Sequence, residues 1–169
     1  DTSNSQSDSK SIEVTLGIST AGVDTVEGSI SGSQSNSQST TNNNAKLNFN
    51  NLKISSSGNS NILGANINAQ DSLALNVGGS LDIQSLQDIQ RSSSGSASIS
   101  SSGSASASLS KSKEKTTVLS SLSAGSIDID VENNTNLQAA LISSTQDTLN
   151  LDTKTLTTSN LSNTKNSRN

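Results

Sequence analysis

The carboxylates that could do chemistry in this chain gather at one place, Asp128-x-Asp130-x-Glu132. Paired carboxylates can act as general acid and base, or they can ligate a divalent cation. No Arg, Lys, His or aromatic residue is repeated beside these acids to orient a substrate or shift a pKa. The acids alternate with aliphatic residues from Ile127 to Val131, which is typical of a strand with one solvated face. We therefore expect no catalytic, cofactor-binding or metal-binding residue and interpret the chain as non-enzymatic; a weak cation site at these acids is the alternative.

Other chemical motifs are absent from the sequence. There is no cysteine and no histidine, which excludes a disulfide framework and thiol chemistry. Phosphate loops, nucleophile elbows and calcium nonapeptides are also missing. The net charge of −4 comes from ten basic and fourteen acidic residues, and the sequence shows no basic patch for nucleic acid and no basic amphipathic face for a membrane. We expect no nucleic-acid partner, no small-molecule substrate and no cofactor.

The elements that hold these residues belong to an internal repeat. Residues 47–90 and 122–162 carry the same order of apolar doublets and turn residues, about 75 positions apart. The matched segments are Leu52-x-Ile54 with Ile127-x-Ile129, Asn61-Ile62 with Asn136-Leu137, and Gln70 to Leu75 with Gln146 to Leu151. One inserted residue between Ile142 and Gln146 shifts the offset, which is recovered before Leu156. A surface turn tolerates such a slip.

A shorter period lies within each copy, because Leu52/Ile54 recurs as Leu73/Leu75 about 21 residues later. Each apolar unit has only two or three alternating residues, which predicts a short strand with one face inward. Clusters of Ser, Asn, Gly and Asp between the units supply turns. In a parallel β-solenoid, equivalent side chains of successive turns stack on one another in this way, and turns of roughly 20 residues are spaced about 4.8 Å apart.

Composition favours a thin core over an ordinary globular one. Apolar residues make up 28% of the chain and aromatic residues 1%, the single aromatic being Phe49. This is too little for a globular core of this length, whereas a solenoid needs only a few aliphatic residues per turn. The alternative is a disordered Ser/Asn-rich linker. Taken alone, the Ser/Gly-rich residues 29–44 and 92–112 would be called flexible.

Two interludes interrupt the repeat. Residues 12–18 alternate between apolar and polar types, and residues 97–109 do so more weakly, which suggests hairpin strands that leave the solenoid and return. Such excursions could cover the solenoid, space the repeats or carry a binding specificity.

The expected organisation is a single solenoid fragment of a longer protein, residues 1–169. Its parts are a first excursion (8–46), a first repeat module (47–90), a second excursion (91–118), a second repeat module (119–162) and the start of the next polar tract (163–169).

The repeated residues resemble the haemagglutinin repeat of filamentous-haemagglutinin-like exoproteins. The segments that carry the resemblance are Ala124 to Ile129, Asn136 to Ile142, Asp147 to Leu151 and Leu63 to Ala69. They match that family's Ala-Gly start, its alternating strands and its Ile-Gly-Ala type of turn. The sequence departs from the family pattern in its high Ser/Asn content and at Ala139, where the second copy would have Gly. In the first copy Asn50-Asn51 stands where the Ala-Gly would be.

The resemblance implies an all-β fold, a right-handed parallel β-helix (solenoid) with extrahelical β-hairpin excursions. It also implies a structural stalk segment of a large exoprotein, secreted or held at the cell surface of a Gram-negative bacterium. The parent would pass through an outer-membrane two-partner-secretion transporter and would act as an adhesin, a haemolysin or a carrier in contact-dependent growth inhibition. Its partner would then be a target-cell surface or outer membrane. The competing hypothesis is a self-contained adhesive binding module acting through the excursions.

Overall fold

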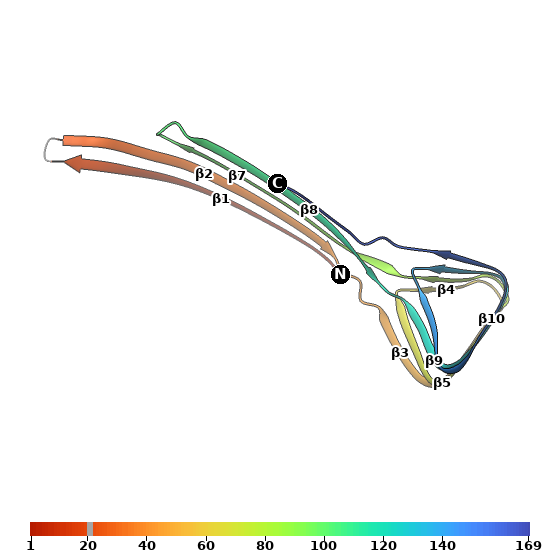
Figure 1. Cartoon of the computed structure of the whole chain (residues 1–169). Helices are drawn as coiled ribbons and strands as arrows, with labels where there is room; N and C mark the ends of the chain where they lie inside the picture. Colours follow the sequence, from red (N-terminus) through yellow and green to blue (C-terminus); the bar gives the residue numbers. More distant parts are fainter. Residues whose placement is uncertain (20–21) are drawn as a thin grey trace. The chain divides into compact units, whose positions relative to one another are not determined.

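The computed structural model describes residues 1–19 and 22–169, which form β-strands and no helix (Figure 1). Within these residues no helix is long and apolar enough to cross a membrane. The strands are β1 (Thr2–Ser19), β2 (Gly22–Thr40), β3 (Ala45–Ser56), β4 (Ser60–Leu63), β5 (Ala65–Val77), β6 (Leu81–Gln84), β7 (Leu86–Ser100), β8 (Ala105–Val118), β9 (Ser121–Gln138), β10 (Leu141–Ser159) and β11 (Thr164–Arg168). The all-β class expected from the sequence is confirmed.

The chain divides into two compact units. The first, here called the hairpin sheet, comprises Asp1–Thr40, Ile89–Glu114 and Thr164–Asn169. The second, here called the parallel stack, comprises Thr41–Asp88 and Lys115–Asn163. Which residues form independent folding modules stays a prediction.

Four strands of the parallel stack lie side by side and run in the same direction. β3 pairs with β5, β5 with β9, and β9 with β10, all parallel (Figure 1). The shorter strands continue this order, since β4 pairs with β6 and β6 with the end of β9. The register shifts between Ser144 and Thr148 and again between Thr153 and Thr155. This confirms the slip and its recovery that the sequence predicts.

The core of the parallel stack consists of aliphatic ladders. Leu52, Leu73, Ile127 and Leu149 occupy one ladder, in register from β3 to β10. Ile54, Leu75, Ile129 and Leu151 form the next ladder. Because equivalent residues stack on one another, two or three aliphatic residues per strand are enough to form a buried core.

Burial depends on the position of a residue along its ladder. Leu73 and Ile127, in the two middle strands, are each 1% exposed, whereas Leu149 at the β10 end is 47% exposed. A residue in a middle strand is covered on both sides, and one in an end strand is covered on one side only. The sequence alone gives these positions the same apolar type, so the difference arises from stacking order.

Small residues stand where the backbone of one strand closely approaches another segment and where the chain turns after a strand. A Cβ on Gly125 would meet the carbonyl oxygen of Asp71 at 2.5 Å, which explains the glycine of the Ala-Gly start. Gly64, which ends the first short strand, has φ +58°. The equivalent residue about 75 positions later, Ala139, has φ 48°. An L-residue with a side chain is disfavoured there by roughly 1–2 kcal/mol, so the missing glycine costs stability.

The hairpin sheet is antiparallel and has the strand order β1-β2-β7-β8-β11. β1 pairs with β2 over almost its whole length, and β2 pairs with β7 from Ser29↔Ser100 to Thr40↔Ile89. Residues 29–40 and 92–100 therefore lie in paired strands. The flexibility suggested by their composition alone is wrong, because the sheet register that satisfies their backbone groups links residues far apart in sequence.

Serine occupies every second position over residues 3–11, 29–39, 92–100 and 106–112 of the four long strands of this sheet, so these serines share one face. The register places Ser11, Ser31 and Ser98 in one row and Ser9, Ser33 and Ser96 in the next. Hydroxyl groups bond along these rows at 2.6–2.8 Å. The bonded pairs are Ser3–Ser39, Ser9–Ser33, Ser11–Ser31, Ser92–Ser112, Ser96–Ser108 and Ser98–Ser106.

Candidate functional site

The acidic residues singled out in the sequence lie on β9 with their side chains in solvent. Asp128, Asp130 and Glu132 are exposed, and Ile129 and Val131 between them are buried. Asp128 Oδ1 accepts a hydrogen bond of 2.9 Å from the side-chain Nδ2 of Asn150 on β10. Among the described residues, no group of three or more acidic, His or Cys side chains is placed to hold a metal ion. The expected absence of a catalytic or metal site stays a prediction.

Two buried serines lie where the chain leaves the parallel stack and re-enters it. Ser85 follows β6 and is 4% exposed, and Ser120 precedes β9 and is 0% exposed. The Ser120 backbone N–H donates to Ser85 Oγ at 2.7 Å, and the Ser85 hydroxyl donates to the Ala139 carbonyl at 2.5 Å. Ser120 Oγ in turn donates to the Gln84 carbonyl at 2.7 Å and accepts from Ala65 N–H at 3.3 Å.

These hydrogen bonds join segments of the parallel stack that lie on either side of β7 and β8 in the sequence. Each buried hydroxyl satisfies backbone groups that water cannot reach. Neither residue could be recognised from the sequence, because a single serine in a chain this rich in serine gives no signal of its own.

A hydrogen bond from a backbone N–H to a side-chain oxygen occurs at equivalent positions in both copies of the repeat. The Asn42 N–H donates to Asp88 Oδ1 at 2.7 Å, and the Thr117 N–H donates to Asn163 Oδ1 at 2.7 Å. In both cases the two residues are 46 positions apart. Asp88 and Asn163 each stand where an interlude begins. The side chain of each accepts a hydrogen bond from a backbone N–H where the preceding interlude ends. The repeat therefore includes the junctions as well as the ladders.

The hairpin sheet carries an exposed apolar row on its face opposite the serines. Ile12 pairs with Ile30, and Ile30 pairs with Ile99. Their exposed fractions are 75%, 62% and 63%. Exposed apolar residues in adjacent strands can contribute to a contact with another molecule.

A groove of about 950 Å³ on the hairpin sheet is rich in positive charge. Arg91, Lys111, Lys113, Lys165 and Arg168 line it, which is half of the ten basic residues of the chain. Its remaining lining is Ser, Asn and Gln. The expectation of no basic patch for nucleic acid stays a prediction, although strand pairing brings together cations that are far apart in the sequence.

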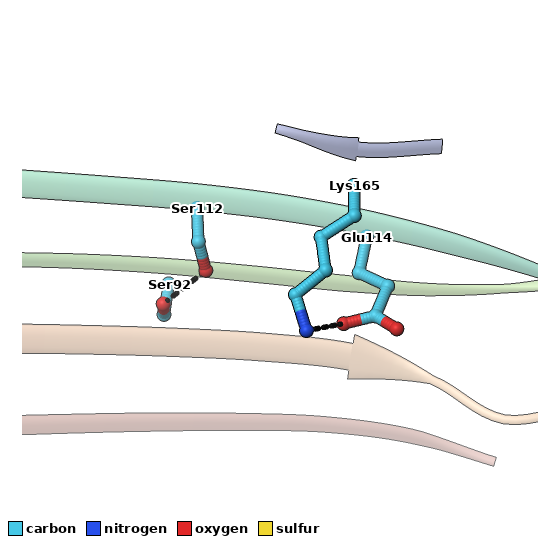
Figure 2. A network of polar contacts seen from close by, with 4 residues as sticks. All are labelled: Ser92, Ser112, Glu114 and Lys165. Carbon is cyan, nitrogen blue, oxygen red and sulfur yellow. Dashed lines mark hydrogen bonds and ion pairs between the residues drawn. The ribbon is translucent and has the colours of Figure 1, made fainter. Parts of the chain in front are cut away.

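The cations of this groove differ in their partners. Lys165 Nζ lies 3.5 Å from Glu114 Oε2, and Figure 2 shows this ion pair near the hydrogen-bonded Ser92 and Ser112. It is the one ion pair found among the described residues. No hydrogen bond or ion pair within the described part of the chain engages the side chain of Arg91, Lys111 or Arg168.

The chain matches one known protein family over a long segment. The family described as hemagglutinin repeat matches residues 1–99, which is more than half of the chain. The chain belongs to the hemagglutinin repeat family. No curated protein and no solved structure matches the chain.

Members of the hemagglutinin repeat family are segments of large adhesin-like exoproteins, which bacteria secrete or expose at their surface. The matched residues contain the first hairpin, the two strand pairs from β3 to β6 and most of β7. The family match and the sequence resemblance thus agree, although the resemblance was carried mainly by the second copy of the repeat.

Proposed function

We propose that the chain is a structural stalk segment of a large secreted exoprotein of a Gram-negative bacterium. The observation that carries this proposal is the register of the aliphatic ladders, which run from β3 through β5 and β9 to β10. In such an arrangement each strand is covered by its neighbours, so length can grow by adding repeats without enlarging the core. That property suits a stalk.

The proposed form of the stalk is a right-handed parallel β-helix with hairpin excursions. Four parallel segments in register support the helix, and the handedness follows from the strong preference for right-handed connections between parallel strands. The buried Ser85 and Ser120 support the idea that the second hairpin is an insertion between two turns, because their hydrogen bonds join the strands on either side of it. The modules 47–90 and 119–162 would each supply two turns.

The stalk would support adhesion or contact-dependent toxin delivery without catalysing a reaction. The parent would leave the cell unfolded through an outer-membrane two-partner-secretion transporter and meet a target-cell surface outside. A chain without cysteine is compatible with this route, because no disulfide has to form or break during export. Folding outside the cell would be driven by burial of the aliphatic ladders.

The competing function is a binding module that acts through the hairpins, and the exposed row Ile12, Ile30 and Ile99 favours it. Replacing these three residues by serine in the parent protein removes the apolar row and keeps strand pairing. If the chain is a stalk, adhesion or toxin delivery stays within about twofold of the unmodified parent. If the hairpins bind the target, delivery falls to the level of a parent that lacks the segment.

The stalk itself is tested in the same assay with Ile129→Asp, which places a charge in the buried ladder. The stalk proposal requires that this variant lose delivery while the surface change Asp130→Asn keeps it. Equal delivery by both variants would contradict a structural role for the ladder.

A further inference from the structure

The hairpin sheet has a long strand edge without a partner among the described strands. β1 is the first strand in the order β1-β2-β7-β8-β11 and pairs with β2 alone (Figure 1). Its other edge presents a row of backbone groups that no described strand satisfies. Proteins often protect such an edge with proline, a bulge or a very short strand. This chain has no proline, and the one register shift of the β1–β2 pairing falls between Gly17 and Ile18, so the edge is regular before that point.

Two opposite charges stand near the middle of this edge strand. Asp8 and Lys10 are two residues apart, so they lie on the same face of the sheet, and both are exposed. On β2 they stand opposite Gln34 and Gly32, which carry no charge. Asp8 accepts a hydrogen bond of 3.3 Å from the side-chain nitrogen of Gln6 on its own strand. Within the described part of the chain neither charged residue makes an ion pair.

These two charges are complementary when β1 pairs with a copy of itself. Two β1 strands related by a twofold axis run antiparallel, and residues of the same face lie opposite each other. An axis through Ser9 sets Asp8 of each copy opposite Lys10 of the other copy. Opposite charges in this position stabilise strand pairing, and like charges destabilise it. An axis at residue 8 or 10 would oppose two aspartates or two lysines, so the charges favour the register centred on Ser9.

The serine row of the hairpin sheet fits the same register. Within the chain, hydroxyl groups join Ser9 to Ser33 and Ser11 to Ser31 at 2.6 Å. With the axis at Ser9, the first row continues to Ser9 of the second copy and the next row continues to Ser7 of that copy. The contact between copies would therefore use the same side chains as the contact between β1 and β2.

We propose that β1 is an interaction edge that pairs antiparallel with β1 of a second copy of the chain, with the twofold axis at Ser9. The edge at the other end of the sheet is a poorer partner for β1. There β11 already pairs with β8, and Glu114 and Ser110 of β8 contact Lys165 and Asn169. This contact goes beyond the stalk function, which needs no second copy.

The dimer is expected to be weak and reversible, because pairing along one strand edge buries less surface than the roughly 1,200 Å² of a stable complex. Sedimentation velocity of the full 169-residue chain, at concentrations up to about 1 mM, measures its dissociation constant. Because the two copies exchange nothing but strand edges, the circular dichroism spectrum should not change with dimerisation.

Charge reversal tests the register. Lys10→Asp sets acids opposite each other at two places, and we expect it to weaken the dimer at least about tenfold. The double variant Asp8→Lys/Lys10→Asp restores opposite charges in the reversed order, and it should dimerise within about threefold of the unmodified chain. The matched control is Lys53→Asp, which makes the same change of net charge at an exposed position on β3 and should leave dimerisation within about twofold.

A single cysteine locates the axis, because the chain has no native cysteine. In the Ser9→Cys variant the two cysteines stand directly opposite, at about 5 Å between Cα atoms, which a disulfide spans. Ser3→Cys is the control, since Ser3 is also exposed, lies on the same face and bonds to a serine of β2. Its two copies would lie about 40 Å apart. We expect a disulfide-linked dimer from Ser9→Cys and free thiols from Ser3→Cys.

Four results would overturn the proposal. The unmodified chain could remain monomeric up to about 1 mM. Lys10→Asp could dimerise as well as Lys53→Asp, or the double variant could fail to restore the dimer. Ser3→Cys could oxidise to a dimer as readily as Ser9→Cys. Circular dichroism of each variant establishes that a loss of dimer does not come from unfolding.

Discussion

Truncation of Leu73 to alanine measures the contribution of one ladder position. Leu73 is 1% exposed on β5 and stands in register between Leu52 of β3 and Ile127 of β9. Leucine-to-alanine changes at buried sites cost the transfer free energy of the lost atoms plus a cavity term, and range from about 2 to 5 kcal/mol. With a neighbour on both sides, Leu73→Ala should lower the free energy of unfolding by about 3 kcal/mol.

The matched control is Leu149→Ala, in the same ladder at the β10 end. Leu149 is 47% exposed, so the same chemical change removes about half of the buried area and leaves no closed cavity. Its expected cost is about 1 kcal/mol. Urea denaturation followed by far-ultraviolet circular dichroism gives both values. Equal losses in the two variants would refute the stacking order, because they would mean that β5 is no better covered than β10.

Three further substitutions test other features. Ala139→Gly should raise the free energy of unfolding by about 1 kcal/mol, because it relieves the positive φ of 48° at a site where the first copy has glycine; an unchanged thermal midpoint would contradict this. Ile129→Asp should abolish cooperative unfolding, because an unpaired charge would enter the apolar ladder, while Asp130→Asn should melt like the unmodified chain. Ser120→Ala should cost about 2 kcal/mol, since it removes a buried hydroxyl that donates to the Gln84 carbonyl and accepts from the Ala65 N–H, whereas Ser106→Ala on the exposed face should cost less than about 0.5 kcal/mol; denaturant titration of both tests this contrast.

The ladders could be predicted from the sequence because they depend on periodicity. Leu52 and Leu73 are aligned by a recurrence of about 21 residues, and the structure pairs them. Leu73 is aligned in turn with Ile127, which lies about 54 residues further along the chain, and one interlude separates the two residues. A repeat of apolar doublets is robust to such an insertion, because the register is set by matching side chains and not by the length of the connection.

The basic groove and the hydrogen bonds of Ser85 and Ser120 could not be predicted in this way. Arg91, Lys111 and Arg168 belong to strands whose neighbours are fixed only by three-dimensional pairing. Their sequence neighbours are serines, which suggested a flexible tract. Serine at every second position was the available signal, since a period of two on all four strands indicates a sheet with one uniform face.

The parallel register continues from β5 to β9 across the hairpin inserted between them in the sequence. Ala74 and Asp128 are 54 positions apart in the sequence and lie opposite each other in that register. The chain has no native cysteine, so an Ala74→Cys/Asp128→Cys variant can be read without background.

Neighbouring parallel strands lie about 4.8 Å apart, which is within the Cα separation that a disulfide spans. The control variant Ala74→Cys/Asp130→Cys shifts the second cysteine by two residues along the same face, to about 8 Å, which is beyond that reach. Mass spectrometry of the oxidised proteins under dilute conditions measures the intramolecular bond. The register predicts a disulfide in the Ala74/Asp128 variant and free thiols in the control; equal oxidation of both, or of neither, would contradict it.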